Sequence, residues 1–133
     1  MSELRWDPIK LLWVIIATDR GRRPLDFQVQ VESNGTTACP FCYGNENKTP
    51  AEIFAIRPGG LPNAANWRVR VIPNKYPALR VEGELNNRGY GMYDVMNGIG
   101  AHEVIIETPE HNRTLADLTT EEITDVLTAW RAR

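Results

Sequence analysis

"WRVRVIPNKYPALRV", residues 67–81, is the stretch that decides the fold class. Trp67 and the two valines after it alternate with two arginines, and side chains that alternate in this way lie on opposite faces of a strand. Pro73 interrupts the strand, because proline has no N–H to donate to a neighbouring strand. The stretch therefore predicts a strand with one apolar and one polar face, then a loop, then a second strand.

Further runs of the sequence combine β-branched and aromatic residues with nearby turn residues, as strands do. They are WVIIA (13–17), DFQVQVE (26–32), AEIFAI (51–56), MYDV (92–95) and HEVIIE (102–107). The first of them is continuously apolar, which is typical of a buried strand. The glycine-rich segment around MYDV, residues 83–101, indicates a long mobile loop.

The C-terminal segment LADLTTEEITDVLTAWRAR, residues 115–133, has the pattern of a helix. Thr119 and Glu122 have the spacing of a capping box, in which each side chain bonds to the backbone N–H of the other residue. An apolar stripe from Ile123 to Trp130 is expected to face a core. Several strands followed by a helix, without regular alternation, predict an α+β domain around an antiparallel sheet.

Composition limits the possible partners. The 133 residues suit one domain, and 42% hydrophobic residues are enough for a core. A formal net charge of −2 lacks the basic excess of duplex-binding domains, so we expect no nucleic-acid partner. The longest apolar run, residues 11–17, is far shorter than the ~20 residues that cross a bilayer, so we expect no membrane span. The N-terminus has no apolar signal segment, which predicts a cytoplasmic protein.

Both cysteines lie in CPFCYGNENKTP, residues 39–50. A cytoplasmic location argues against a stable disulfide, and the Gly, Asn and Pro that follow argue against the helix that a thioredoxin-like redox pair needs. A zinc site explains the Cys-x-x-Cys spacing better, with His102 or His111 joining it from a distant element. Two reduced cysteines at a turn are the alternative.

Four segments in this order carry a resemblance to a known family. They are RWDPIKLLWVIIATDRGRRPLDF (5–27), CPFCYGNE (39–46), WRVRVIPNKYPAL (67–79) and GAHEVIIETPEHN (100–112). Together they resemble the N-terminal half of galactose-1-phosphate uridylyltransferase, a branch of the histidine-triad superfamily. The resemblance covers essentially the whole chain. It implies an antiparallel sheet of the histidine-triad type with a C-terminal helix packed on it.

The resemblance also implies a zinc site. Its cysteine ligands would be Cys39 and Cys42, and its histidine ligand would be His111, which occupies the histidine position of the family's Ser/Thr-Pro-x-His turn. A further histidine ligand would come from the second half of the family's domain. For His102 we expect a structural role, either packing at a sheet edge or a hydrogen bond.

Two groups of residues match positions that bind the nucleotide in the family. The first group is the turn after the first predicted strand: Arg20, Gly21, Arg22 and Arg23. Guanidinium groups pair bidentately with phosphate oxygens, although a solvated basic turn has the same composition. The second group is Asn74 and Lys75, where the Asn amide can both donate to and accept from a ribose or a base.

The chemistry that the resemblance implies is ping-pong uridylyl transfer between UDP-glucose and galactose 1-phosphate, through a histidine in a His-Pro-His-x-Gln motif. This sequence has no His-Pro-His. We therefore expect a chain truncated after Arg133, without the catalytic half, without a catalytic residue and inactive alone, whose intact form is a homodimer. The expected ligands are a UDP-sugar, a sugar phosphate and zinc. The alternatives are an adenylyl-transferring sugar-phosphate phosphorylase and a non-catalytic zinc-binding module.

Overall fold

The structure, a computed structural model, describes residues 2–18, 20 and 39–133. These residues form two units, each with its own sheet, and the second unit includes Glu103–Arg133. No helix among the described residues has the length and apolarity needed to cross a membrane.

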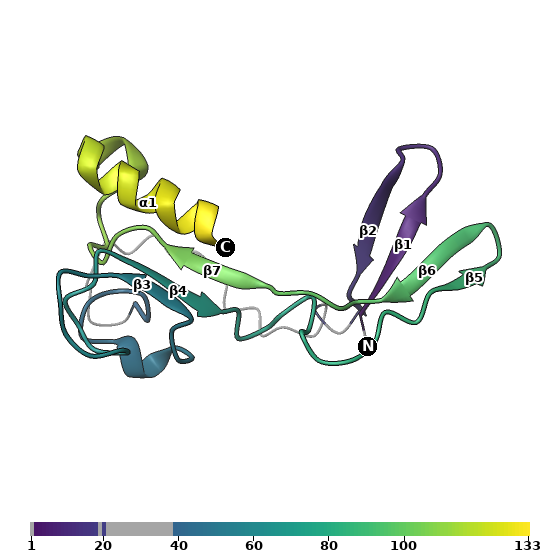
Figure 1. Cartoon of the computed structure of the whole chain (residues 1–133), viewed down its shortest axis with the longest axis horizontal. Helices are drawn as coiled ribbons and strands as arrows, with labels where there is room; N and C mark the ends of the chain where they lie inside the picture. The colour runs from purple at the N-terminus through teal and green to yellow at the C-terminus, as the bar shows by residue number, and fades with distance from the viewer. Residues whose placement is uncertain (1, 19, 21–38) are drawn as a thin grey trace. The chain divides into compact units, whose positions relative to one another are not determined.

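The first unit contains a four-stranded antiparallel sheet (Figure 1). Its strands are β1 (Glu3–Asp7), β2 (Leu12–Ile16), β5 (Arg88–Tyr90) and β6 (Tyr93–Asn97), in the order β2-β1-β6-β5. The β1–β2 turn is closed by Asp7, whose Oδ1 accepts from the N–H groups of Lys10 at 3.0 Å and Ile9 at 2.9 Å. These two bonds stabilise the ionised carboxylate and lower the pKa of Asp7.

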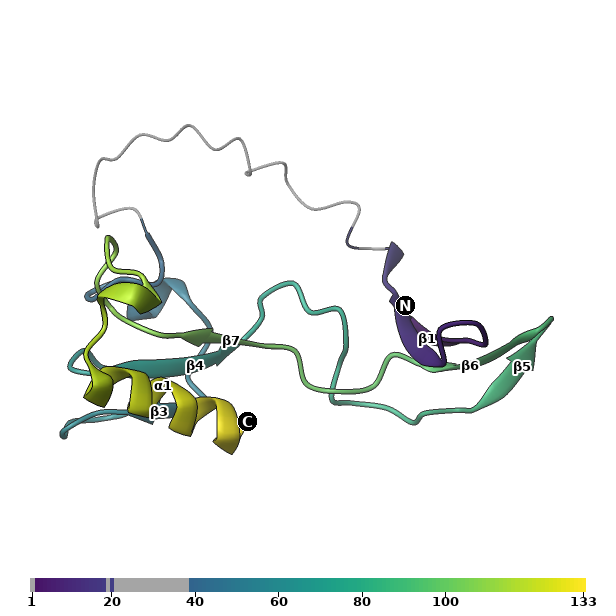
Figure 2. The same ribbon diagram turned by 90° about the horizontal axis from the view of Figure 1, so that it is seen from above.

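The second unit contains a three-stranded antiparallel sheet in the order β3-β4-β7, with helix α1 against one face (Figures 1 and 2). The strands are β3 (Phe54–Ile56), β4 (Val69–Pro73) and β7 (Glu103–Ile106). Short 3-10 turns occupy η2 (Glu46–Lys48) and η3 (Leu115–Asp117), and α1 spans Thr120–Ala132. These elements confirm the predicted α+β class, with two antiparallel sheets where the sequence indicated one.

The core of the second unit lies on both faces of β4. Val69 and Val71 pack against Val126 and Ala129 of α1. On the opposite face, Ile72 packs with Trp67 and with Ile106 of β7. The alternation predicted within β4 is correct, but Trp67 precedes the strand and joins the Ile72 face.

The predicted polar face of β4 is wrong for Arg70. Arg70 has no exposed surface, and its guanidinium is held by Glu52 Oε2 at 3.1 Å and Thr49 Oγ1 at 2.8 Å. Alternation shows which residues share a face but not whether that face is covered. Residues 49–52 cover this one, and they supply the acceptors that a buried guanidinium requires.

The other strand predictions differ in outcome. β3, β6 and β7 confirm the runs at 51–56, 92–95 and 102–107, and residues 26–32 lie outside the described residues. The strand expected after the 67–81 loop is reduced to one isolated bridge between Arg80 and Ile99. The segment 83–101 forms a β5–β6 hairpin instead of a loop around one strand. β1 was not predicted, because ELRWD carries charges at three of five positions.

β2 forms as predicted, but it is not buried. Leu12 to Ile15 are each more than a third exposed, and only Ile16 is partly covered. In the part of the chain that the structure describes, β2 lies at the edge of its sheet and pairs only with β1.

Helix α1 begins at the predicted capping box. Glu122 Oε2 accepts the N–H of Thr119 at 2.7 Å, and Thr119 Oγ1 accepts the N–H of Glu122 at 3.3 Å. The apolar stripe faces the core only in part, because Val126 is buried while Leu127 and Trp130 are about half exposed.

Glu122 also joins the helix to the loop before it. Arg113 donates to both of its carboxylate oxygens, at 2.8 and 2.7 Å. The Arg113 side chain and the Thr119 N–H together lower the pKa of Glu122 from 4.5 to about 2.

These contacts predict an acid-sensitive helix start. A carboxyl whose pKa is lower in the folded state contributes stability above its unfolded pKa, so the contribution of Glu122 is complete above pH 4.5 and is lost as the pH falls toward about 2. We expect Glu122→Gln to lower the melting temperature at pH 7 and to converge with the unsubstituted protein near pH 2. Thermal denaturation followed by circular dichroism across this range measures the difference.

The matched control is Glu121→Gln, because the neighbouring Glu121 side chain is 78% exposed and pairs with Arg68 at 3.1 Å. Surface pairs of this kind contribute about 0–1 kcal/mol. An equal loss in both variants at pH 7 would contradict a special role for Glu122.

Candidate metal centre

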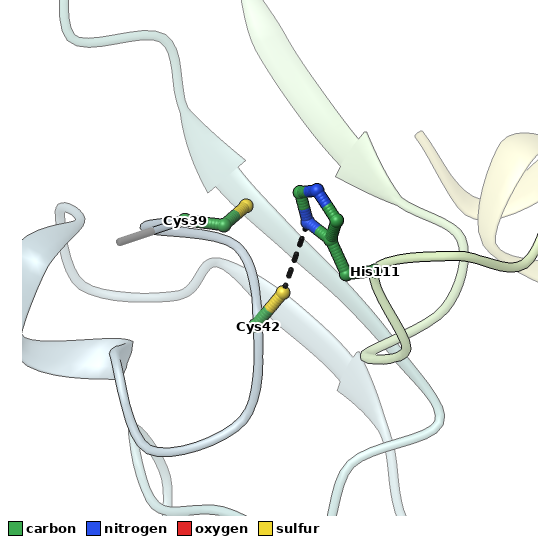
Figure 3. A group of neighbouring side chains, drawn as sticks. All are labelled: Cys39, Cys42 and His111. Carbon is green, nitrogen blue, oxygen red and sulfur yellow. Dashed lines mark hydrogen bonds between the residues drawn. The ribbon is translucent and has the colours of Figure 1, made fainter. Parts of the chain in front are cut away.

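Two segments far apart in the sequence bring three ligand-type side chains together. Cys39 and Cys42 lie on one turn, His111 lies on the loop after β7, and their side chains point toward one another (Figure 3). Their possible ligand atoms all lie within 4.8 Å of one another, and Cys42 Sγ is 3.5 Å from His111 Nδ1. The fold therefore brings the two cysteines and His111 together, although they lie far apart in the sequence.

Backbone bonds shape the cysteine turn. The N–H of Cys42 donates to Cys39 O at 3.4 Å, and the N–H of Asn45 donates to Cys42 O at 3.2 Å. Gly44 has a φ of +83°, a conformation that glycine adopts without the penalty other residues incur. The Gly after the second cysteine thus lets the chain reverse into η2 while both thiols stay on the same side.

The histidine loop is held by its own side chains. The N–H of Glu110 donates to Thr108 Oγ1 at 3.2 Å, which closes the turn around Pro109. Two residues after His111, Arg113 pairs with Glu110 at 3.0 Å and with Glu122 of α1 at 2.7 Å. The imidazole therefore projects from a loop that is fixed to the helix.

The three side chains suit a zinc ion. Thiolate and imidazole are the ligands that zinc prefers, and a tetrahedral site with Zn–S near 2.3 Å and Zn–N near 2.0–2.1 Å separates neighbouring S and N atoms by roughly 3.5–3.6 Å. The distance from Cys42 Sγ to His111 Nδ1 is 3.5 Å. No large movement of these two residues is needed for both to bind one ion.

Burial adds an electrostatic argument. Cys42 is only 5% exposed, and burial, followed by its hydrogen bond with Cys39, raises the pKa of the Cys42 thiol. A buried thiolate requires a nearby positive charge, and a divalent metal supplies it. In the described part of the chain these are the three residues that form a His, Cys, Asp or Glu group able to hold a metal.

An open cavity lies beside the cluster. It has a volume of about 370 Å³ and is lined by residues 42–43 and 109–113. Cys42 and His111 both belong to this lining, while Arg113 and Glu110 supply charges of opposite sign next to them. A fourth ligand can approach the cluster from this side.

His102 does not take part in the cluster. It belongs to the first unit, where its Nδ1 accepts the N–H of Ala78 at 2.8 Å. An Nδ1 that accepts a hydrogen bond carries no proton, so any ring proton of the neutral side chain is on Nε2. The bond agrees with the structural role predicted for this residue.

The predicted nucleotide-binding residues fall in different segments. Arg20 follows β2 and is half-buried, with its N–H donating to Ala17 O at 3.1 Å. Asn74 and Lys75 follow the last residue of β4 directly. Gly21, Arg22 and Arg23 lie outside the described residues. The nucleotide role of all six stays a prediction.

Sequence reasoning missed the residues that support the cluster. Asn45 and Glu46 are buried, and Arg113 connects the histidine loop to α1. A polar pair directly after Gly44 was a usable signal for a turn, but nothing in the sequence indicated that the pair would be buried.

Comparison with known proteins assigns the chain to a family. The family model described as "Galactose-1-phosphate uridyl transferase, N-terminal domain" matches residues 1–133. ADP-glucose phosphorylase of Arabidopsis thaliana is 38% identical over 136 residues, which cover 98% of this chain and 38% of that protein. Galactose-1-phosphate uridylyltransferase of Thermotoga maritima is 24% identical over 131 residues, which cover 98% of this chain and 34% of that protein.

Comparison with solved structures finds relatives of the same two kinds. The crystal structure of the Arabidopsis thaliana ADP-glucose phosphorylase with bound ADP-glucose matches with a TM-score of 0.58 at 38% identity, over 100% of this chain and 37% of that one. A uridylyltransferase structure matches with a TM-score of 0.57 at 26% identity, over 96% of this chain and 32% of that one. The chain thus spans between 32% and 38% of the length of these relatives.

The geometry of the cluster predicts which substitutions release a metal. We expect one zinc ion per chain in the purified protein, and a fall toward zero in Cys42→Ser and in His111→Ala, because each removes a ligand from a set of three. Native mass spectrometry after dialysis measures the ratio.

His102→Ala is the control for His111→Ala. It removes the acceptor of the Ala78 N–H, so it should cost about 1–3 kcal/mol of stability without loss of metal. Zinc retained in His111→Ala, or lost in His102→Ala, would contradict the assigned ligands.

Proposed function

Because the chain belongs to the galactose-1-phosphate uridyl transferase family as its N-terminal domain, we propose that it forms the N-terminal part of an enzyme that transfers a nucleotidyl group from a nucleotide-sugar to a phosphate-bearing acceptor. The relatives on which this rests are named for reactions of nucleotide-sugars or sugar phosphates. The catalytic histidine that the family resemblance implies would lie in a further segment of the polypeptide.

The observation that carries the choice of nucleotide is the difference in identity among relatives. Each alignment covers 98% of this chain, and the ADP-glucose phosphorylase is 38% identical while the Thermotoga maritima uridylyltransferase is 24% identical. We therefore propose ADP-glucose as the nucleotide-sugar. UDP-glucose with a hexose 1-phosphate is the second candidate, supported by the family description and by the uridylyltransferases that match.

Within this chain, we propose Arg20 of the first unit and Lys75 of the second unit as two separate candidates for phosphate contacts. A guanidinium and an ammonium group both form charge-assisted hydrogen bonds to phosphate oxygens, which are about twice as strong as neutral ones. Asn74, next to Lys75, carries an amide that can contact the ribose or the base.

The position of Asn74 and Lys75 favours this assignment. They follow β4, whose first four residues are buried, so the point where the chain leaves the sheet is held by the core. A binding residue next to a rigid strand loses less conformational entropy when the ligand binds.

We propose zinc as the metal, bound by Cys39, Cys42 and His111. Sulfur and nitrogen ligands select zinc over magnesium or calcium, which prefer oxygen. Bound there, the ion supplies a cross-link between the turn at residues 39–42 and the loop at residue 111. Its binding free energy then contributes directly to folding. We propose that this role is structural, because the ion would tie together two segments that lie far apart in the sequence.

The proposed nucleotide preference has a direct test in thermal unfolding of the full-length protein. A ligand at 100 times its Kd stabilises a folded protein by about 2.7 kcal/mol. We expect ADP-glucose to raise the melting temperature more than UDP-glucose does at equal concentration. A larger shift with UDP-glucose would favour uridylyl transfer, and equal shifts would contradict the proposed preference for ADP-glucose.

Lys75→Ala tests the phosphate contact. Loss of a hydrogen bond to a charged group costs about 1.5–3 kcal/mol, so the Kd for ADP-glucose should rise roughly 10- to 100-fold in isothermal titration calorimetry. Lys10→Ala is the matched control, because Lys10 is an exposed lysine in the β1–β2 turn. An unchanged Kd in Lys75→Ala would remove this residue from the site.

A further inference from the structure

Buried polar side chains lie within the cysteine segment, residues 39–50, and in contact with it. Among the described residues, the polar or charged residues that are buried are Asn45 (8% exposed), Glu46 (9%) and Arg70 (0%). Asn45 and Glu46 belong to the segment 39–50, and Arg70 bonds to it through Thr49. Burying a polar group costs free energy unless the group is hydrogen-bonded, so the hydrogen-bond partners of these three side chains show what holds the segment in place.

Asn45 acts on the first cysteine. Its side-chain Nδ2 donates to the carbonyl oxygen of Cys39 at 2.7 Å. The same oxygen accepts the backbone N–H of Cys42 at 3.4 Å, which is long for a hydrogen bond. The shorter and stronger restraint on the Cys39 backbone is therefore the Asn45 side chain and not the turn itself.

Glu46 holds the other end of the turn. Its Oε1 accepts the indole Nε1–H of Trp67 at 2.9 Å, and Trp67 is fully buried. Tyr43, one residue after Cys42, donates its hydroxyl to Trp67 O at 2.6 Å, and the two rings pack edge to face at 5.3 Å. Tyr43 and Glu46, which flank Asn45 in the sequence, are thus both bonded to the buried Trp67. The backbone that carries the Asn45 amide is therefore held in place.

From these contacts we propose that Asn45 is a positioning residue for the metal centre: its amide fixes the Cys39 backbone so that both thiolates face one ion. The proposal rests on the zinc site of the proposed function and identifies a further residue on which that site depends. In this proposal Asn45 acts through the Cys39 backbone and not as a metal ligand.

The chemistry of the site explains why such a restraint is needed. A four-residue turn closed by one long bond allows the first thiol to rotate away, whereas zinc requires both sulfurs near 2.3 Å in a tetrahedral arrangement. Some residues orient the metal ligands by hydrogen bonds without binding the metal. Replacing such a residue typically weakens metal affinity by about 10- to 100-fold. An amide suits this position because it donates to a carbonyl without adding charge beside two thiolates.

The test is zinc affinity in the full-length protein, measured by competition with a chromogenic chelator. Asn45→Asp keeps the size of the side chain but replaces the donor with a carboxylate oxygen, which repels both the Cys39 carbonyl and the thiolates. We expect the Kd for zinc to rise about 10- to 100-fold. Asn45→Ser removes the reach to Cys39 without adding charge, and we expect a smaller rise in the same direction. If Asn45→Asp does not fold, Asn45→Ser decides the proposal.

Asn97→Asp is the matched control. Asn97 makes the same kind of bond, from Nδ2 to Glu84 O at 2.9 Å, in the unit that holds none of the three ligands. It should lower stability without changing zinc affinity. Cobalt(II) binding gives a second reading, because the absorption bands of cobalt report thiolate ligation and tetrahedral geometry. We expect them to weaken in Asn45→Asp and to stay unchanged in Asn97→Asp.

The outcomes separate this proposal from the one it rests on. A folded Asn45→Asp protein that binds zinc as tightly as the unsubstituted protein overturns the positioning role and leaves the zinc site intact. An equal loss of affinity in Asn97→Asp also overturns it, because the effect would then be one of general stability. An unsubstituted protein that binds no zinc overturns the metal site itself, and the positioning role with it, while the nucleotide preference is judged by its own experiment.

Discussion

The guanidinium of Arg70 is fully buried on the face of β4 opposite helix α1, and the structure of the second unit is arranged around this charge. Three acceptors meet it: Glu52 Oε2, Thr49 Oγ1 and, at 3.5 Å, Pro50 O. Removing one partner of a buried ion pair costs about 3–5 kcal/mol, because the other charge stays buried without compensation. Residues 49–52, which close the segment that carries the cysteines, must therefore lie against β4.

A metal bound at this position would join two segments that the sheet alone does not connect. The segment that follows the cysteine turn is attached through Glu46 to Trp67, just before β4, whereas the histidine loop is attached to α1 through Arg113 and Glu122. Cys42 and His111 are 69 residues apart in the sequence, so a metal cross-link would close a long loop. Closing such a loop restricts the unfolded chain, and binding energy at the site becomes folding energy.

The family assignment and the fold support each other, but they constrain function at different levels. The fold of this chain matches both an ADP-glucose phosphorylase, with a TM-score of 0.58, and a uridylyltransferase, with a TM-score of 0.57. Backbone geometry therefore does not separate the two chemistries. A fold shared across a family does not determine which substrate a member accepts, because function depends on the particular side chains of the site.

The family resemblance was needed to select His111 over His102, whereas the amino-acid sequence alone determined the local elements: the capping box at Thr119, the alternation in β4, and Cys39 and Cys42 as possible zinc ligands. These depend on residue type and short spacing, which a chain keeps whatever its surroundings. Burial was decided by tertiary structure. Arg70 is covered and β2 is exposed, the reverse of what their residue types predict, because coverage depends on which distant segment packs on a face. The supporting contacts of Asn45, Glu46 and Arg113 arise in the same way, since each requires a partner that only the folded chain places nearby.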